Sequence, residues 1–272
     1  MKTSARNQLA GTTSSRQITG ALLSTLLFSS PVLPQVAGAA DVHVAVAANF
    51  SGPLQKLAPL YEHSSGNQLI VSQGSSGQLY TQIRQGAPFD VFLSADVDKP
   101  LQLERESLTV AGSRFIYAIG RLVLWSPQAD LIDAEGNVLK AQHYRFIGIA
   151  NPQTAPYGTA AQQLLTRLGL WEPLNQRKKI VVGENITQTW QFASTGNVDM
   201  AFVALSQVLD ADGHIPGSSW QPPQDLYDPI EQAAVALSGS KQQPEAQAFL
   251  IWLHTDPGAL SVIHAAGYRT AL

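Results

Sequence analysis

Four short segments of this sequence carry small polar residues that could bind a ligand. Each follows a strand-like run and stands at the start of a predicted helix: residues 47–50 (AANF), 74–77 (GSSG), 151–158 (NPQTAPYG) and 183–187 (GENIT). None contains Lys or Arg, so their donors are neutral hydroxyl, amide and backbone N–H groups. These segments favour a bound anion, because the first N–H groups of a helix are unpaired and the helix dipole is positive there. The chemistry they suit is the binding of a fully dehydrated tetrahedral oxyanion.

The sequence lacks the motifs of the common hydrolytic and metal enzymes. Its six His residues are scattered without HExxH or His-x-His spacing, and the absence of Cys excludes thiol catalysis and cysteine metal sites. No GxSxG segment precedes a helix, and no carboxylate pair stands out by its spacing. Asp90 and Asp96 flank a strand-like run. We expect them to cap a helix or to bridge neighbouring segments, and not to catalyse a reaction. We therefore expect no enzyme activity and no cofactor.

Strand-like and helix-like segments alternate along the chain after residue 40. Residues 42–47 are predicted to form a strand of a buried sheet. A helix is predicted to start next, because Ser51 can cap its N-terminus and Pro53 fits its first turn. Later segments continue the alternation: 68–72, 78–85, 89–94, 115–125, 146–150, 159–168, 179–182, 187–195 and 200–203. This order predicts an α/β fold with mostly parallel sheets and a ligand at the carboxyl ends of the strands. All four polar segments fall there.

The polar segments divide into two pairs, one before residue 115 and one after residue 145. One site between two lobes explains this separation better than four unrelated turns. The apolar runs 116–125 and 230–237 are candidates for two crossover strands. We therefore expect lobe one at residues 41–120 plus 228–272, and lobe two at residues 121–227.

Residues 1–40 have the composition of a secretory signal peptide. Three basic residues precede an apolar stretch at 18–28, and small residues follow at 37–40, which places cleavage after Ala39 or Ala40. The apolar stretch is short for a bilayer-spanning helix, although a retained N-terminal anchor is the alternative. We therefore expect an exported, periplasmic protein.

Charge excludes nucleic acid as the expected partner. The formal net charge is -3, and the sequence has no basic cluster beyond Arg177-Lys178-Lys179. A nucleic-acid-binding domain instead carries a basic stripe or patch. We expect a monomer whose ligand is a small anion.

Residues spread along the whole chain after position 40 carry a family likeness. They are 46–50 (VAANF), 74–77 (GSSG), 82–96 (QIRQGAPFDVFLSAD), 150–152 (ANP), 156–158 (PYG), 184–186 (ENI) and 265–268 (AAGY). In this order they resemble the periplasmic molybdate-binding proteins that feed ABC transporters, which have the two-lobed type II solute-binding fold. The segment 82–96 is the most specific, since a single GSSG turn is common.

The resemblance implies a function and a set of ligand contacts. The function is high-affinity binding of molybdate and tungstate for delivery to a membrane permease, with molybdenum held only as its oxyanion. The alternative is a binding protein for another tetrahedral oxyanion such as sulfate. Ser76 would contribute a hydroxyl and a backbone N–H, and the other contacts would be mainly backbone N–H groups. The implied ligand-binding residues are Ala48, Asn49, Ser76, Tyr157 and Ile186.

The chain departs from the family pattern at Ala204. Many members have a Tyr there whose hydroxyl contacts the ligand, so the side-chain amide of Asn49 is a candidate replacement and the number of donors stays open. Structural roles also stay open. Ser76 could cap the following helix, Asn49 could be a turn residue, and Tyr157 could be a packing aromatic.

Overall fold

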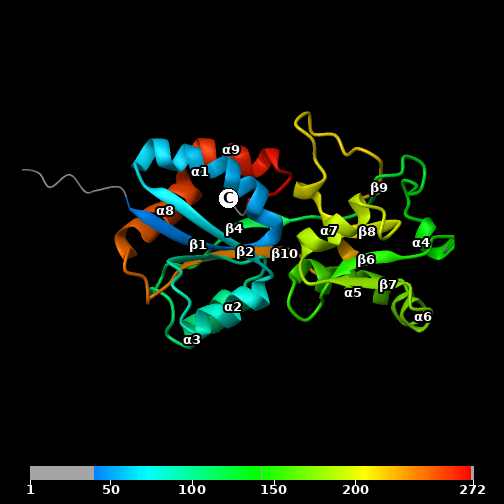
Figure 1. Ribbon diagram of the computed structural model, residues 1–272, viewed down its shortest axis with the longest axis horizontal. Coiled ribbons are helices and arrows are strands. Elements are labelled where there is room, and N and C mark those ends of the chain that lie inside the picture. The colour runs from blue at the N-terminus through cyan, green and yellow to red at the C-terminus, as the bar shows by residue number, and fades with distance from the viewer. Residues whose placement is uncertain (1–39, 142, 271–272) are drawn as a thin grey trace, which may run out of the picture. The chain divides into compact units, whose positions relative to one another are not determined.

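The structure is a computed structural model that describes residues 40–141 and 143–270. The expected signal peptide at residues 1–40 lies outside the described residues, apart from Ala40 itself. Within the described part of the chain, no helix is both long enough and apolar enough to cross a membrane. The described residues form two five-stranded sheets flanked by helices (Figure 1). We call the first sheet with its helices lobe one, and the second sheet with its helices lobe two.

The sheet of lobe one has the strand order β2-β1-β3-β10-β4. Its strands are β1 (Asp41–Ala47), β2 (Gln68–Gly74), β3 (Val91–Leu93), β4 (Phe115–Gly120) and β10 (Ile230–Ala236). Side chains alternate between the two faces of a strand, so Val44 and Val46 join one core cluster while Ala45 joins another. The second half of the interior strand β1 is therefore buried on both faces.

Helices cover both faces of this sheet (Figure 1). One face carries α1 (Ser51–Ser65), α8 (Gln243–Thr255) and α9 (Pro257–Ala265), and the other carries α2 (Ser76–Arg84) and α3 (Asp98–Arg105). On the first face the rings of Tyr61 and Phe249 meet edge to face, with centroids 5.0 Å apart. On the second face Leu79 and Leu103 pack with Phe92 of the sheet.

The sheet of lobe two has the strand order β7-β6-β8-β5-β9. Its strands are β5 (Leu122–Ser126), β6 (Ile147–Ala150), β7 (Ile180–Gly183), β8 (Met200–Ala204) and β9 (Ser218–Trp220). The α-helices of this lobe are α4 (Val138–Ala141), α5 (Pro156–Arg167), α6 (Trp171–Gln176) and α7 (Ile186–Ser194). Leu164 of α5 shares a core cluster with Ile149, whereas Ala193 of α7 shares another with Val203. The two helices therefore pack on opposite faces.

The chain crosses between the sheets twice. It leaves the first sheet at the end of β4 and enters the second at β5, and it returns through the 3-10 helix η3 (Gln224–Leu226) into β10. Strand β10 is antiparallel to β3 and β4, and β5 is antiparallel to β8 and β9. The remaining four pairings are parallel, so the two-lobed α/β fold is as expected but its sheets are mixed. The reason is that β5 and β10 enter their sheets from the other lobe and run opposite to their neighbours.

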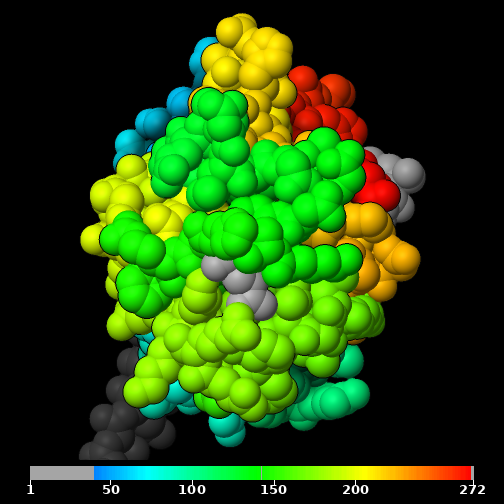
Figure 2. Space-filling view, turned by 90° about the vertical axis from the view of Figure 1, so that its right-hand side faces the viewer, coloured from blue at the N-terminus to red at the C-terminus, as the bar shows by residue number. Residues whose placement is uncertain are grey.

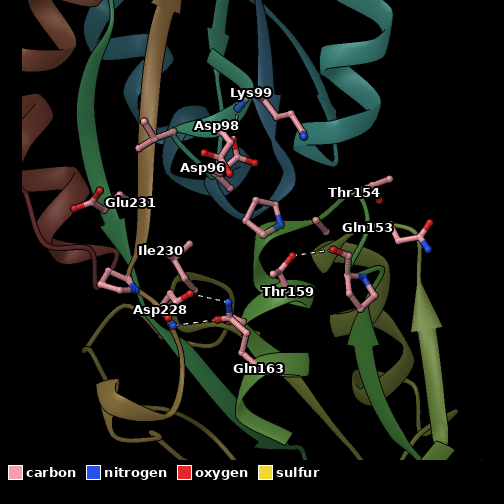
Figure 3. Close-up of a pocket in the computed structure, with 17 residues that line it drawn as sticks. Asp96, Asp98, Lys99, Gln153, Thr154, Thr159, Gln163, Asp228, Ile230 and Glu231 are labelled. Atoms are coloured by element: carbon pink, nitrogen blue, oxygen red, sulfur yellow. Dashed lines mark hydrogen bonds between the residues drawn. The ribbon is translucent and has the colours of Figure 1, made fainter. Parts of the chain in front are cut away.

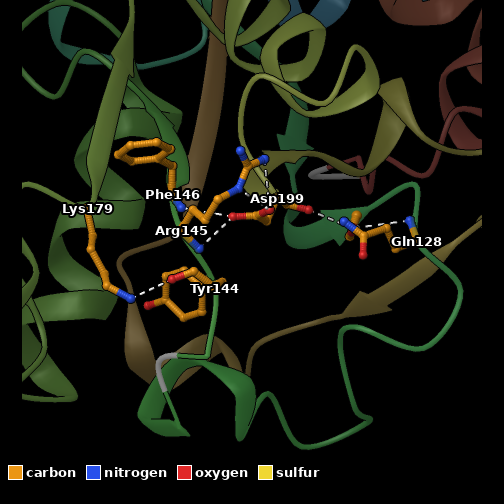
Figure 4. Close-up of polar contacts among 7 residues, drawn as sticks. Gln128, Tyr144, Arg145, Phe146, Lys179 and Asp199 are labelled. Carbon is orange, nitrogen blue, oxygen red and sulfur yellow. Dashed lines mark hydrogen bonds and ion pairs between the residues drawn. The ribbon is translucent and has the colours of Figure 1, made fainter.

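Asp199 ties the turn before β6 to the turn before β8 (Figure 4). Its Oδ2 accepts the backbone N–H groups of Arg145 at 2.7 Å and Phe146 at 2.9 Å, and the Arg145 guanidinium lies 3.3 Å from Oδ1. Nearby, Lys179 Nζ donates to the Tyr144 carbonyl at 2.5 Å. Figure 2 shows this outer end of lobe two, with the β5 to β6 connection in green above the yellow-green region of α6. These contacts fix two neighbouring parallel strands in register.

Candidate functional site

The four polar segments all lie at the carboxyl ends of strands, as the sequence predicts. Each connects a strand to the helix that follows it: β1 to the 3-10 helix η1 (Ala48–Phe50), β2 to α2, β6 to α5, and β7 to α7. Two of these connections belong to lobe one and two to lobe two. The topology therefore brings segments more than a hundred residues apart in the chain to the boundary between the lobes.

A small cavity lies where these segments meet. Its lining includes all five residues expected to contact the ligand: Ala48, Asn49, Ser76, Tyr157 and Ile186. Counted as the space open to the centre of a water molecule, its volume is about 10 Å³, far below the several hundred Å³ that organic ligands need. Among the described residues, its lining contains no Lys, Arg, His, Asp or Glu. The cavity is therefore neutral and suits only a very small ligand.

The starts of three α-helices line the cavity. Ser76 and Ile186 are the first residues of α2 and α7, and Tyr157 is the second residue of α5. Backbone N–H groups at such positions have no partner inside the helix, and each helix places the positive end of its dipole there. Three helix starts, one from lobe one and two from lobe two, thus border the same cavity.

Two adjacent serines at the start of α2 have different hydrogen bonds. Ser75 is the cap: its Oγ accepts the Gln78 N–H at 3.4 Å, and its own N–H donates to the Gln78 side chain at 3.2 Å. Ser76 is fully buried, and its Oγ accepts the Ala95 N–H at 2.9 Å. Among the described residues the Ser76 hydroxyl hydrogen has no acceptor. The capping role therefore belongs to Ser75, and the Ser76 hydroxyl can donate to a ligand.

The Asn49 side chain is buried and already engaged. Its Nδ2 donates to Gln232 Oε1 at 2.8 Å and to Tyr268 Oη at 2.9 Å. An amide nitrogen has two hydrogens, so none remains for a ligand in this arrangement. The amide of Asn49 is therefore not free to replace the hydroxyl missing at Ala204, and the backbone N–H is the group of Asn49 that is left to donate.

Hydroxyl groups gather beside Asn49 from elements near the other end of the chain. Ser206, in the 3-10 helix η2 (Leu205–Gln207) that follows Ala204, donates to the Asn49 carbonyl at 2.9 Å. Tyr268 Oη donates to the same carbonyl at 2.8 Å and lies 2.9 Å from Ser206 Oγ. These hydroxyls hold the first polar segment in place.

The buried tyrosines of this region are neutral. Burial raises the pKa of Tyr268 to about 12, and it raises the pKa values of Tyr117 and Tyr157 well above the ordinary value. A phenol with such a pKa keeps its proton throughout the range in which proteins are stable. The tyrosines therefore add hydrogen bonds near the cavity without adding charge.

Gln232 is the main polar residue of this region whose role the sequence did not predict. It is fully buried in β10, and its Oε1 accepts from Asn49 and from Tyr117 Oη at 3.0 Å. Its signal in the sequence is its place inside the apolar run 230–237, because a polar side chain buried in a strand needs partners. Those partners come from distant segments, so the sequence alone does not name them.

Direct hydrogen bonds join the two lobes around the cavity. The Gly77 N–H of α2 donates to the Thr154 carbonyl of lobe two at 2.9 Å. Thr187 Oγ1 of α7 donates to the Ala48 carbonyl of lobe one at 3.4 Å. In this structure the lobes are therefore closed over the cavity.

A larger cavity of about 350 Å³ adjoins the first, also between the lobes (Figure 3). Its charged lining residues among those described are Asp96, Asp98, Lys99, Asp228 and Glu231. Asp96 accepts the Lys99 N–H at 2.8 Å near the start of α3, and burial raises the pKa of its carboxyl group. Four carboxylates against one ammonium group repel a dianion. The small neutral cavity is therefore the better oxyanion site.

Curated relatives of this sequence cover most of its length. A molybdate-binding protein from Azotobacter vinelandii is 49% identical over 237 residues, which cover 87% of this chain and 93% of the relative. A molybdate-binding protein from Rhodobacter capsulatus is 46% identical and covers 88% of this chain and 91% of its own length.

A similar solved structure and a matching protein family are consistent with these relatives. The periplasmic molybdate-binding protein of Azotobacter vinelandii superposes with a TM-score of 0.82 at 42% identity, covering 84% of this chain and 98% of that one. Residues 42–269 match the family described as bacterial extracellular solute-binding protein. Members of this family bind solutes rather than transform them. The chain therefore belongs to the bacterial extracellular solute-binding protein family.

Proposed function

We propose that this protein binds molybdate, and also tungstate, outside the cytoplasm and delivers the oxyanion to the membrane permease of an ABC transporter. The observation that carries the proposal is the small neutral cavity bordered by three helix starts and the Ser76 hydroxyl. The named ligand of the Azotobacter and Rhodobacter relatives supports the choice of anion.

The proposed contacts follow from the groups left without partners. Ser76 donates through its hydroxyl and its backbone N–H, and Tyr157 and Ile186 donate through backbone N–H groups. Ala48 and Asn49 of η1 donate through their backbones. Burying a bare dianion would cost tens of kcal/mol by Born solvation, so several converging donors are needed. Each helix start adds about half a positive charge, which offsets much of the ligand charge.

Neutral donors also explain how the oxyanion can be released. A dianion held by Arg in bidentate pairs would be hard to surrender to a transporter. Here the donors are split between the lobes, so opening the lobes removes part of the set at once. The ligand favours closure because only the closed form supplies all the contacts.

Cavity size and donor type set the proposed selectivity. Donors fixed on helices and strand ends keep their spacing, so sulfate, with its shorter bonds, would leave some contacts long. Protonated phosphate would present an O–H to a donor, and each such mismatch costs about 1 to 3 kcal/mol. Molybdate and tungstate are nearly equal in size, so we expect the protein to bind both.

We propose that the mature chain begins after the signal peptide of residues 1–40 and works as a periplasmic monomer. Its lobe one would comprise residues 41–120 plus 228–272, and its lobe two residues 121–227. The two crossings at β4 to β5 and at β10 support these bounds.

Calorimetric titration tests the proposed function. The exported protein, freed of ligand, is titrated with molybdate, and sulfate and phosphate serve as parallel titrants. We expect tight one-to-one binding of molybdate and negligible heat from sulfate. Tight sulfate binding would favour the alternative oxyanion, and no binding of any of the three would refute the proposal.

A further inference from the structure

A chain of buried side chains links the first polar segment to the third across the lobe boundary. Asn49 of lobe one donates to Gln232 Oε1 at 2.8 Å, and Gln232 Nε2 donates to Tyr157 Oη of α5 at 3.3 Å. Asn49, Gln232 and Tyr157 are each at most 2% exposed. Two segments that border the ligand cavity are therefore connected by side chains, in addition to any ligand between them.

The fold makes room for the Tyr157 hydroxyl at the crossing between the lobes. Gly120, the last residue of β4, pairs with Ile230 at the start of β10. A Cβ atom at position 120 would collide with Tyr157 Oη and would lie 2.7 Å from Gln232 Nε2. Any residue larger than glycine would thus displace the hydroxyl from its place against the crossover backbone.

Further hydrogen bonds fix the geometry of the pair. Gln232 Oε1 also accepts the Tyr117 hydroxyl at 3.0 Å, and the pairing of β10 with β4 shifts register between Gln232 and Ala233. The same Gln232 oxygen accepts the Asn49 amide N–H at 2.8 Å. A buried amide in an apolar strand is unfavourable unless its polar atoms find partners. In this closed arrangement, Tyr157 is the hydrogen-bond partner that lobe two supplies to Gln232.

We propose that the Tyr157 hydroxyl and the Gln232 amide form a latch that holds the lobes closed and slows escape of the bound oxyanion. Tyr157 would then act twice: its backbone N–H contacts the ligand, and its side chain holds the lobes together. Gln232 is a positioning residue that never touches the ligand. This inference rests on the proposed function, since it concerns release of the same oxyanion.

The expected effect is kinetic. A net intramolecular hydrogen bond between neutral groups changes an equilibrium by about 3- to 10-fold. Because the latch forms only after the lobes close, its loss should raise the rate of dissociation and leave the rate of association nearly unchanged. The expected change is thus a 3- to 10-fold faster release with a matching rise in Kd.

Tyr157→Phe is the test variant, because it removes the hydroxyl and keeps the ring and the backbone N–H. Tyr144→Phe is the matched control. Tyr144 is a buried tyrosine of the same core cluster, and its hydroxyl has no hydrogen-bond partner among the described residues. Dissociation of molybdate is followed by stopped flow, and the unfolding free energy without ligand is measured in urea.

We expect faster release from Tyr157→Phe and wild-type release from Tyr144→Phe. Release at the wild-type rate from Tyr157→Phe would overturn the latch even if its stability falls, since a merely structural hydroxyl changes unfolding and not release. Gly120→Ala is a second test variant, because its methyl group displaces the same hydroxyl and should also speed release of molybdate.

A ligand-free readout separates this inference from the proposed function. The sequence has no Cys, so spin labels can be attached through Cys introduced at exposed Gln55 of lobe one and Gln176 of lobe two. We expect Tyr157→Phe to shift the interlobe distances toward longer values relative to Tyr144→Phe. If the wild-type protein bound no oxyanion, the proposed function would fail, while unchanged distances would refute the latch by itself.

Discussion

Ser75 and Ser76 illustrate how chemically identical neighbours can differ in role. Ser75 completes a reciprocal capping arrangement with Gln78, while Ser76 is fully buried and borders the cavity. The sequence predicts that Ser76 contacts the ligand and leaves open that it caps the helix instead. The structure separates them because only the first helical residue turns its hydroxyl toward Ala95 and the lobe boundary.

The pair gives a prediction at the scale of single residues. Ser76→Ala should weaken molybdate binding by about 1 to 3 kcal/mol, because it removes a hydrogen bond to a charged ligand. Ser75→Ala should instead lower the unfolding free energy by about 0.5 to 2 kcal/mol through loss of the cap. Calorimetry and urea unfolding of both variants check this, and equal affinities in the two variants would remove the Ser76 hydroxyl from the site.

The residues of the site were predictable to different degrees. Ser76, Tyr157 and Ile186 follow local rules, since each stands in a short segment that joins a strand to a helix. The bonding of Asn49 was not predictable, because its partners Gln232 and Tyr268 lie far away in the chain. A local pattern predicts a backbone donor at Asn49 but not the partners of its side chain.

At the scale of elements, the candidate site lies at strand ends and helix starts. The alternation of strands and helices could be predicted from the sequence, but the antiparallel direction of β5 and β10 could not. Periodicity shows that a segment is a buried strand but not from which end it enters its sheet. Those two strands cross from the other lobe, so their direction depends on the whole topology.

Asp199 gives a prediction at this scale, because it joins the turns before β6 and β8. Burial alone would raise the pKa of its carboxyl group, but the N–H groups of Phe146 and Arg145 and the Arg145 charge lower it overall. A lowered folded pKa means that the carboxylate stabilises the fold above the unfolded pKa of about 3.9. That stabilisation is lost as the pH falls through the folded pKa.

Asp199→Asn should therefore lower the unfolding free energy by about 1 to 2 kcal/mol at neutral pH. The difference from wild type should shrink as the pH falls below about 4. Asp130→Asn is the control, since Asp130 is exposed and has no hydrogen bond among the described residues. Urea unfolding at several pH values measures both variants, and a pH-independent loss in Asp199→Asn would contradict this account of the carboxylate.

At the scale of the whole molecule, the site exists only where the lobes meet. The proposed donors of η1 and α2 belong to lobe one, and those of α5 and α7 belong to lobe two. The spacing of the polar segments in the sequence predicts this division. The hydrogen bonds that close the lobes were not predictable, because Gly77 with Thr154 and Gln232 with Tyr157 pair residues 75 or more positions apart.

In the proposed function, the oxyanion lies in the small neutral cavity and not in the larger acidic one beside it. Crystals grown with molybdate and measured at the molybdenum absorption edge test this directly. We expect one anomalous peak in the small cavity, with Ser76 Oγ and the backbone nitrogens of Tyr157 and Ile186 at hydrogen-bond distance from the ligand oxygens. A peak between Asp96 and Glu231, or none in crystals of a protein that binds molybdate tightly in solution, would contradict it.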